Sequence, residues 1–103
     1  MLLTQSQVER AERYAAIASG IMLAPVRDRS RSQRSCWARY FVADALASEG
    51  WTYDLVGRFL GRNRTSVNHM VGMVNQMKQY PVMYAGEYER YLLFQEKISD
   101  AIQ

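Results

Sequence analysis

The strongest constraint on the fold is a run of helical apolar spacing that lies between two helix-stopping residues. Apolar residues recur there at intervals of three and four, which places their side chains on one face of an α-helix. These residues are Val67, Met70, Val71, Val74 and Met77. Gly61 precedes the run and Pro81 follows it, and proline prevents a helix from continuing. We therefore expect a helix from about Arg64 to Gln79, with Asn63 as its N-cap.

A shorter helix is expected directly before this one. Thr52 is a suitable N-cap, and Gly61 ends the helix after only about two turns. Its inward stripe consists of Leu55, Val56, Phe59 and Leu60. A short helix, a glycine-containing turn and a longer helix have the layout of a helix-turn-helix, in which the second helix enters the major groove of DNA.

The N-terminal segment, residues 1–24, is expected to form one helix from about Thr4 to Ser19. Two overlapping capping boxes fit its start, and a glycine and a proline follow its end. The boxes are Thr4 with Gln7 and Ser6 with Glu9, and the stop residues are Gly20 and Pro25.

Two further helices complete the prediction. One, about Ser35 to Ser48, is apolar around most of its circumference, which is typical of a central, buried helix. The other, about residues 87–102 of the C-terminal segment 84–103, is expected to bury Tyr88, Tyr91, Leu92, Ile98 and Ile102. The methionines expected in the core are Met70, Met73, Met77 and Met83.

The chain of 103 residues is 49% apolar, which is enough to form one hydrophobic core without a disulfide or a structural metal. We predict an all-α, single-domain bundle of about five helices over residues 1–103.

Positive charge is concentrated in the middle of the chain. The net charge is +3, but residues 27–78 hold nine Lys or Arg against four acids, so this segment is net +5 and its flanks are net −2. A basic segment between neutral or acidic ends indicates a face that binds a polyanion. A solvated surface without a partner is the alternative.

Residues 25–34 read PVRDRSRSQR and show no apolar periodicity, so we expect a loop or an extended arm, with Ser32 or Ser35 capping the next helix. Arg29, Arg31 and Arg34 on such an arm can reach a narrow minor groove or the phosphates. A disordered basic loop that binds nothing is the alternative.

The exposed face of the helix at 64–79 lacks acidic residues. It consists of Arg64, Thr65, Asn68, His69, Gly72, Asn75 and Gln76, and no carboxylate occurs between Arg58 and Gln79. Amide, hydroxyl, imidazole and guanidinium groups can donate to phosphates and read base edges. The free N–H groups of the helix start, with the hydroxyls of Thr65 and Ser66, suit a phosphate. A polar face that lacks acids by chance is the alternative.

The string GRNRTSVNH at residues 61–69 resembles the signature of the C-terminal DNA-binding domain of the bacterial replication initiator DnaA, approximately G-G-R-D-H-T-T-V-x-H. Leu55-Val56-Gly57, the apolar stretch 40–46 and RSRS at 29–32 fit the same family, and the resemblance covers about residues 27–79. It implies that Arg64, Thr65 and Asn63 face bases in the major groove. It also implies that Ser66, His69 and Arg62 contact phosphate and that Arg29 enters the minor groove. This chain lacks one glycine of the signature and has Asn63 in place of Asp and Arg64 in place of His, so the family's recognition sequence does not carry over.

The sequence contains no residue pattern that indicates a catalytic, cofactor or metal site. The chain has a single histidine, no spacing that suggests a triad or a carboxylate pair, and no G-x-x-x-x-G-K-[ST] phosphate loop. Cys36 is the only cysteine, which excludes an internal disulfide and suits a reducing compartment. No apolar run approaches the roughly 20 residues of a membrane span, and the start lacks the features of a signal peptide. We expect a cytoplasmic protein that is not an enzyme, with double-stranded DNA as its partner and with no cofactor, metal, membrane or small-molecule substrate.

Another interpretation is a helical protein–protein interaction module without nucleic-acid binding. Six methionines and seven tyrosines can form an adaptable apolar surface. The stripe Tyr80, Tyr84, Tyr88 and Tyr91 either packs as a seam between helices, which we favour, or stays exposed and supports a homodimer. Structured RNA ranks lower than DNA because its deep, narrow major groove does not admit a helix.

Overall fold

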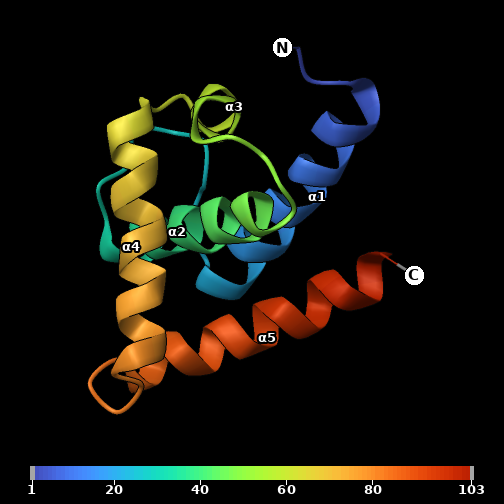
Figure 1. The fold of residues 1–103 in the computed structure, drawn as a ribbon. Helices are drawn as coiled ribbons and strands as arrows, with labels where there is room; N and C mark the ends of the chain where they lie inside the picture. Colours follow the sequence, from blue (N-terminus) through green and yellow to red (C-terminus); the bar gives the residue numbers. More distant parts are fainter. Residues whose placement is uncertain (1, 103) are drawn as a thin grey trace.

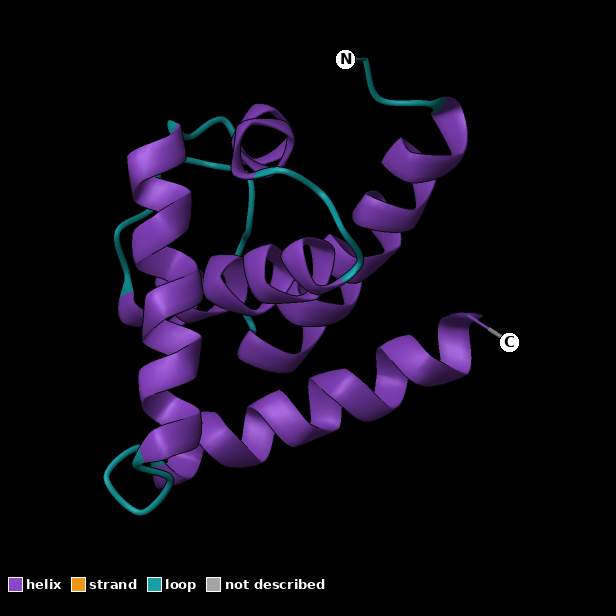
Figure 2. Ribbon diagram, in the orientation of Figure 1, coloured by secondary structure: helices purple, strands orange, loops and turns teal. Residues whose placement is uncertain are grey.

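Five helices make up the part of the chain that the structure, a computed structural model, describes: residues 2–102, with the side chains of residues 2–100. They are α1 (Gln5–Met22), α2 (Gln33–Ser48), α3 (Tyr53–Leu60), α4 (Arg64–Gln79) and α5 (Ala85–Ile102). No strand occurs within these residues (Figure 2). The predicted all-α class is confirmed.

Helix α2 lies at the centre of the molecule and touches each of the other four helices (Figure 1). Its large apolar side chains Trp37, Phe41, Val42 and Leu46 are all buried, as its apolar circumference predicts, because every side of a central helix faces a neighbour. One continuous core cluster contains side chains from all five helices.

Side-chain caps fix where the first four helices begin. In each case the cap oxygen accepts a hydrogen bond from the backbone N–H three residues later, which satisfies a donor that the helix leaves free. The caps are Thr4, Ser32, Thr52 and Asn63. Thr4 rather than Ser6 therefore caps α1, and Ser32 rather than Ser35 caps α2.

The predicted end of α1 at Ser19 is wrong by three residues. The helix continues through Gly20 to Met22, and Leu23 ends it in the left-handed conformation with φ 55°. Gly20 lies within the helix, because a single glycine lowers the stability of a helix without interrupting it.

Helices α3 and α4 meet at a tight turn, with α3 seen end-on beside the vertical α4 (Figure 1). Gly61 ends α3 at φ 69°, a left-handed conformation that glycine adopts without steric cost. The Arg62 N–H donates to the Gly57 carbonyl at 2.9 Å. A Cβ on Gly57 would lie well inside the 3.0 Å limit from the Arg62 carbonyl oxygen, so this close approach requires glycine.

The predicted inward face of α5 is correct for Tyr91 and Ile98 and for the partly buried Tyr88, but it is wrong for Leu92. Tyr91, Phe94 and Ile98 are buried, whereas Leu92 is 51% exposed. The inward stripe follows the spacing i, i+3, i+7, and Leu92 lies one residue, about a quarter turn, away from it. Ile102 lies outside the part whose side chains are described.

Two further predictions concern Met83 and the row of tyrosines near the start of α5. Met83 is 74% exposed, so its predicted place in the core is wrong; Pro81 ends α4 and the chain turns outward there. Tyr91 is buried and Tyr84 and Tyr88 are partly buried against the core, which matches the packed seam, but Tyr80 is half exposed.

Candidate nucleic-acid interface

The start of α4 is an open surface to which the helix itself contributes no acidic side chain. Asn63 Oδ1 accepts from the Ser66 N–H at 2.8 Å and so fixes the first turn. The exposed side chains around it are Arg64, Thr65, Asn68 and His69, and Ser66 is half exposed. The residues predicted to bind DNA on this helix therefore lie together in its first two turns.

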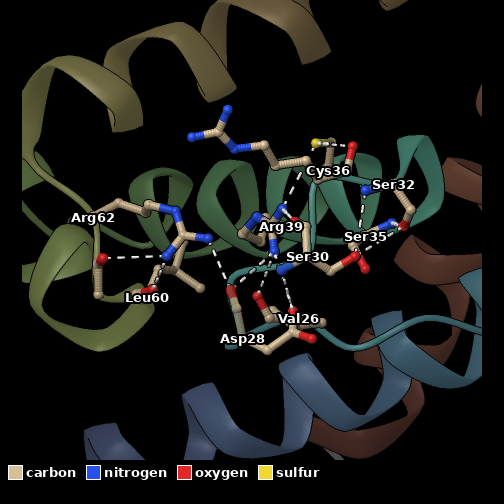
Figure 3. Close-up of polar contacts among 11 residues, drawn as sticks. Val26, Asp28, Ser30, Ser32, Ser35, Cys36, Arg39, Leu60 and Arg62 are labelled. Atoms are coloured by element: carbon tan, nitrogen blue, oxygen red, sulfur yellow. Dashed lines mark hydrogen bonds and ion pairs between the residues drawn. The ribbon is translucent and has the colours of Figure 1, made fainter.

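The segment before α2, here called the arginine arm (residues 25–32), is fixed from inside by Arg39 (Figure 3). The Arg39 side chain is only 4% exposed. Its Nη1 donates to the carbonyls of Val26 and Asp28 at 3.1 and 3.4 Å, and its Nη2 donates to the Ser30 carbonyl. Sequence reasoning missed this residue, although an arginine on an otherwise apolar helix is a usable signal, because a buried charge needs partners.

Arg62 joins the same arm to the turn between α3 and α4. Its Nη1 donates to the carbonyls of Leu60 and Gly61 at 3.3 and 3.2 Å, and its Nη2 donates to the Asp28 carbonyl at 2.8 Å (Figure 3). The resemblance implies a phosphate contact for Arg62, but its guanidinium is engaged with three backbone carbonyls.

The other basic residues divide into engaged and free ones. Arg34 belongs to α2 and donates to the Met22 carbonyl at 3.1 Å, which ties it to the end of α1. By contrast, Arg29, Arg31 and Arg64 are exposed. Among the described residues, none of these three side chains has a hydrogen-bond or ion-pair partner. Of the arginines predicted to bind DNA, these three remain for a partner.

A cleft of about 660 Å³ separates the arginine arm from the start of α4 and reaches down to α2. Arg29, Arg31, Thr65, Ser66 and His69 contribute to its walls, and no carboxylate lines it. An anion in this cleft meets donors from the arm on one side and from α4 on the other. The cleft is open to solvent, as a site for a long polymer requires.

Aromatic packing holds His69 at the edge of this cleft. Its ring contacts Tyr40 edge-on, with the centroids 5.9 Å apart and the planes at 87°. Burial raises the pKa of Tyr40, so its phenol stays neutral and adds no negative charge beside the arginines.

The carboxylate of Asp54 lies near the start of α4, although Asp54 is ten residues earlier in the sequence than Arg64. Asp54, in the first turn of α3, lines a shallower hollow together with Arg58 and Arg64. This hollow shares Gly61 and Arg62 with the cleft but not Thr65, Ser66 or His69, so the acid-free lining belongs to the cleft and not to the surroundings of Arg64.

The far end of α4 is anchored to the core. Asp44 of α2 is 5% exposed, accepts from the Tyr91 hydroxyl at 2.9 Å and lies 3.9 Å from Lys78 Nζ. Burial is the main cause that raises the pKa of Tyr91. Gln76 donates to the Tyr84 hydroxyl at 2.8 Å, so this member of the predicted exposed face also serves the fold.

Residues 2–100 contain no group of three or more His, Cys, Asp or Glu side chains that could hold a metal ion. Across the described helices, none is both long and apolar enough to cross a membrane. Comparisons with protein-family models, with curated proteins and with solved structures find no match for this chain.

Proposed function

We propose that this chain is a non-enzymatic protein that binds double-stranded DNA, with α4 in the major groove in the manner of a DnaA-like helix-turn-helix. The observation that carries the proposal is the position of three unengaged arginines. Arg29 and Arg31 line a cleft without carboxylates beside the start of α4, and Arg64 is exposed at the first position of α4, next to a second hollow that Asp54 also lines. Unpaired guanidinium groups around a helix N-terminus suit a polyanion.

The chemistry of each group supports a division of roles. Arg64 and Asn68 are exposed on α4 outside the cleft, and Thr65 is exposed at its wall; these three suit base edges. Ser66 and His69 also line the cleft, and their hydroxyl and imidazole groups suit phosphate. Asn63 uses its Oδ1 as the cap, and its amide NH₂ remains for a base acceptor.

The arginine arm adds a second point of contact. Arg29 and Arg31 lie across the cleft from α4, where they suit the phosphates or the adjacent minor groove. A duplex fits this pair of elements better than structured RNA, because the RNA major groove is too deep and narrow for α4. The proposed role is that of an accessory factor in replication or transcription control in the cytoplasm.

The test is fluorescence anisotropy with labelled duplex DNA across a salt series. The natural chain is compared with R64Q, with R29Q/R31Q and with the control R13Q, which removes one charge, as R64Q does, at an exposed position of α1. Removing one phosphate-binding cation lowers the log–log salt slope by about 0.9. We expect R29Q/R31Q to flatten the slope and R64Q to weaken binding, while R13Q behaves as the natural chain.

A natural chain that does not bind duplex at low salt contradicts the proposal. Equal losses of affinity in R13Q and R64Q also contradict it, because a diffuse charge effect does not depend on position.

A second candidate, a protein-interaction module or homodimer, is favoured by the loop between α4 and α5. Val82 and Met83 are 91% and 74% exposed and lie beside the half-exposed Tyr80, and apolar groups gathered on a surface commonly mark contacts between proteins. Sedimentation of the natural chain and of V82D/M83D tests this candidate. A mass that stays at one protomer for both over a hundredfold concentration range counts against self-association.

A further inference from the structure

The arginine arm is not a free loop, because its backbone is bonded to a buried charge. The carbonyls of three alternate residues, Val26, Asp28 and Ser30, converge on the Arg39 guanidinium (Figure 3). Burying a guanidinium is unfavourable unless its donors are satisfied. Here the carbonyls satisfy them, and the Asp28 carboxylate at 3.7 Å offsets part of the charge. The Arg39 guanidinium therefore uses its hydrogen bonds to hold the backbone of the arginine arm.

The same arm is joined to the turn between α3 and α4. The Asp28 carbonyl accepts from Arg39 Nη1 at 3.4 Å and from Arg62 Nη2 at 2.8 Å. Arg62 also donates to the carbonyls of Leu60 and Gly61. One peptide group thus connects α2, the arm and the turn that precedes α4.

The residue that follows each of these carbonyls is an arginine whose side chain is exposed. The side chains of Arg27, Arg29 and Arg31 are exposed. The Arg27 guanidinium lies 4.3 Å above the Phe59 ring of α3, which fastens the first part of the arm. Arg29 and Arg31 are left beside the cleft, at positions that the buried bonds define.

We propose that Arg39 and Arg62 are positioning residues, which hold the arginine arm so that Arg29 and Arg31 are already placed for the DNA backbone before binding. The inference rests on the proposed DNA-binding function and names how part of that site is built. A loop that is ordered in advance loses less conformational freedom on binding, so it binds more tightly with the same contacts. Arg62 then acts through Asp28 and does not touch the DNA itself.

The experiment uses substitutions that keep every charge. R39K and R62K retain the cation but cannot reproduce the fork that spans several carbonyls, and R13K on α1 is the matched control. We expect the amides of residues 27–31 to exchange hydrogen faster in R39K and R62K while the α4 amides stay protected. Duplex affinity should fall about tenfold in both, the order expected for coupled residues in one network. The salt slope should become smaller by about 0.9 for each arm arginine that no longer reaches a phosphate.

A second comparison separates positioning from general damage to the fold. R29Q/R31Q should weaken binding about tenfold in the natural chain and less than about twofold in the R39K background, because the arm is already misplaced there. Equal penalties in the two backgrounds overturn the proposal. If R39K does not fold, R62K carries the same test. A direct phosphate contact by Arg62 would be retained largely by lysine, so near-natural binding of R62K also overturns it.

The outcomes also distinguish this inference from the function on which it rests. If R64Q weakens binding while R39K and R62K bind as the natural chain does, the DNA-binding function stands and the positioning role is wrong. If the natural chain does not bind duplex, both are wrong.

Discussion

Substituting alanine for two glycines should change stability in opposite directions, because the fold uses one of them and not the other. A Cβ on Gly57 meets the backbone carbonyl of Arg62 well inside 3.0 Å, whereas a Cβ on Gly72 meets no atom within 4 Å. Both glycines lie inside helices, so alanine gains about 1 kcal/mol of helix propensity at either site. Only at Gly57 is that gain opposed by a clash.

The clash at Gly57 cannot be relieved cheaply, because the atom it meets belongs to the main chain. Moving the turn weakens the 2.9 Å hydrogen bond from the Arg62 N–H to the Gly57 carbonyl and shifts Arg62 away from Asp28. Overpacking costs about 1–3 kcal/mol, and breaking a hydrogen bond costs about 1 kcal/mol. After the propensity gain, G57A should be less stable by about 1–3 kcal/mol, and its melting temperature should fall by about 4–8 °C for each kcal/mol.

Thermal and urea unfolding followed by far-ultraviolet circular dichroism measure both variants. G72A should melt about 4–8 °C above the natural chain, since it gains about 1 kcal/mol without any clash. A G57A variant that melts at or above the natural chain would refute the argument that close approach of α3 to the turn requires glycine. A destabilised G72A would show that this position is not open.

Three further predictions concern the core. Burial raises the pKa of Tyr91, and burial with the bond to Glu49 raises the pKa of Tyr14 to about 12; both exceed the unfolded value of about 10. The stability that these two tyrosines contribute should therefore be fully present below about pH 10 and be lost as pH rises beyond it, and urea midpoints that stay level between about pH 9 and 11.5 would contradict this. F94A should cost about 3–5 kcal/mol while L92A stays within about 0.5 kcal/mol, because Phe94 is fully buried and Leu92 is half exposed; equal urea midpoints would show the assigned α5 face to be wrong. The Ser35 hydroxyl is buried without a hydrogen-bond partner among the described residues, so S35A should be at least as stable as the natural chain, and a clear drop in its melting temperature would reveal a bond that serine makes.

The sequence determines the helices of this protein because the signals that define them are local. Apolar spacing, capping side chains and stop residues act within one or two turns, so α3 and α4 begin where Thr52 and Asn63 predict. The acid-free face at the start of α4 is equally visible, since it depends only on helical periodicity and on the absence of Asp and Glu from one stretch.

Tertiary structure alone decides which arginines are free, and the reason is that hydrogen bonds to carbonyls distant in the sequence leave no local pattern. Arg39 reaches residues nine to thirteen positions earlier, and Arg62 reaches Asp28, 34 positions earlier. The sequence shows a uniform row of basic residues, whereas the fold buries or engages Arg34, Arg39 and Arg62 and leaves Arg29, Arg31 and Arg64 open. The inward face of α5 is likewise settled by packing, because Leu92 and Phe94 are both apolar and only the position of the neighbouring helices decides which of them is buried.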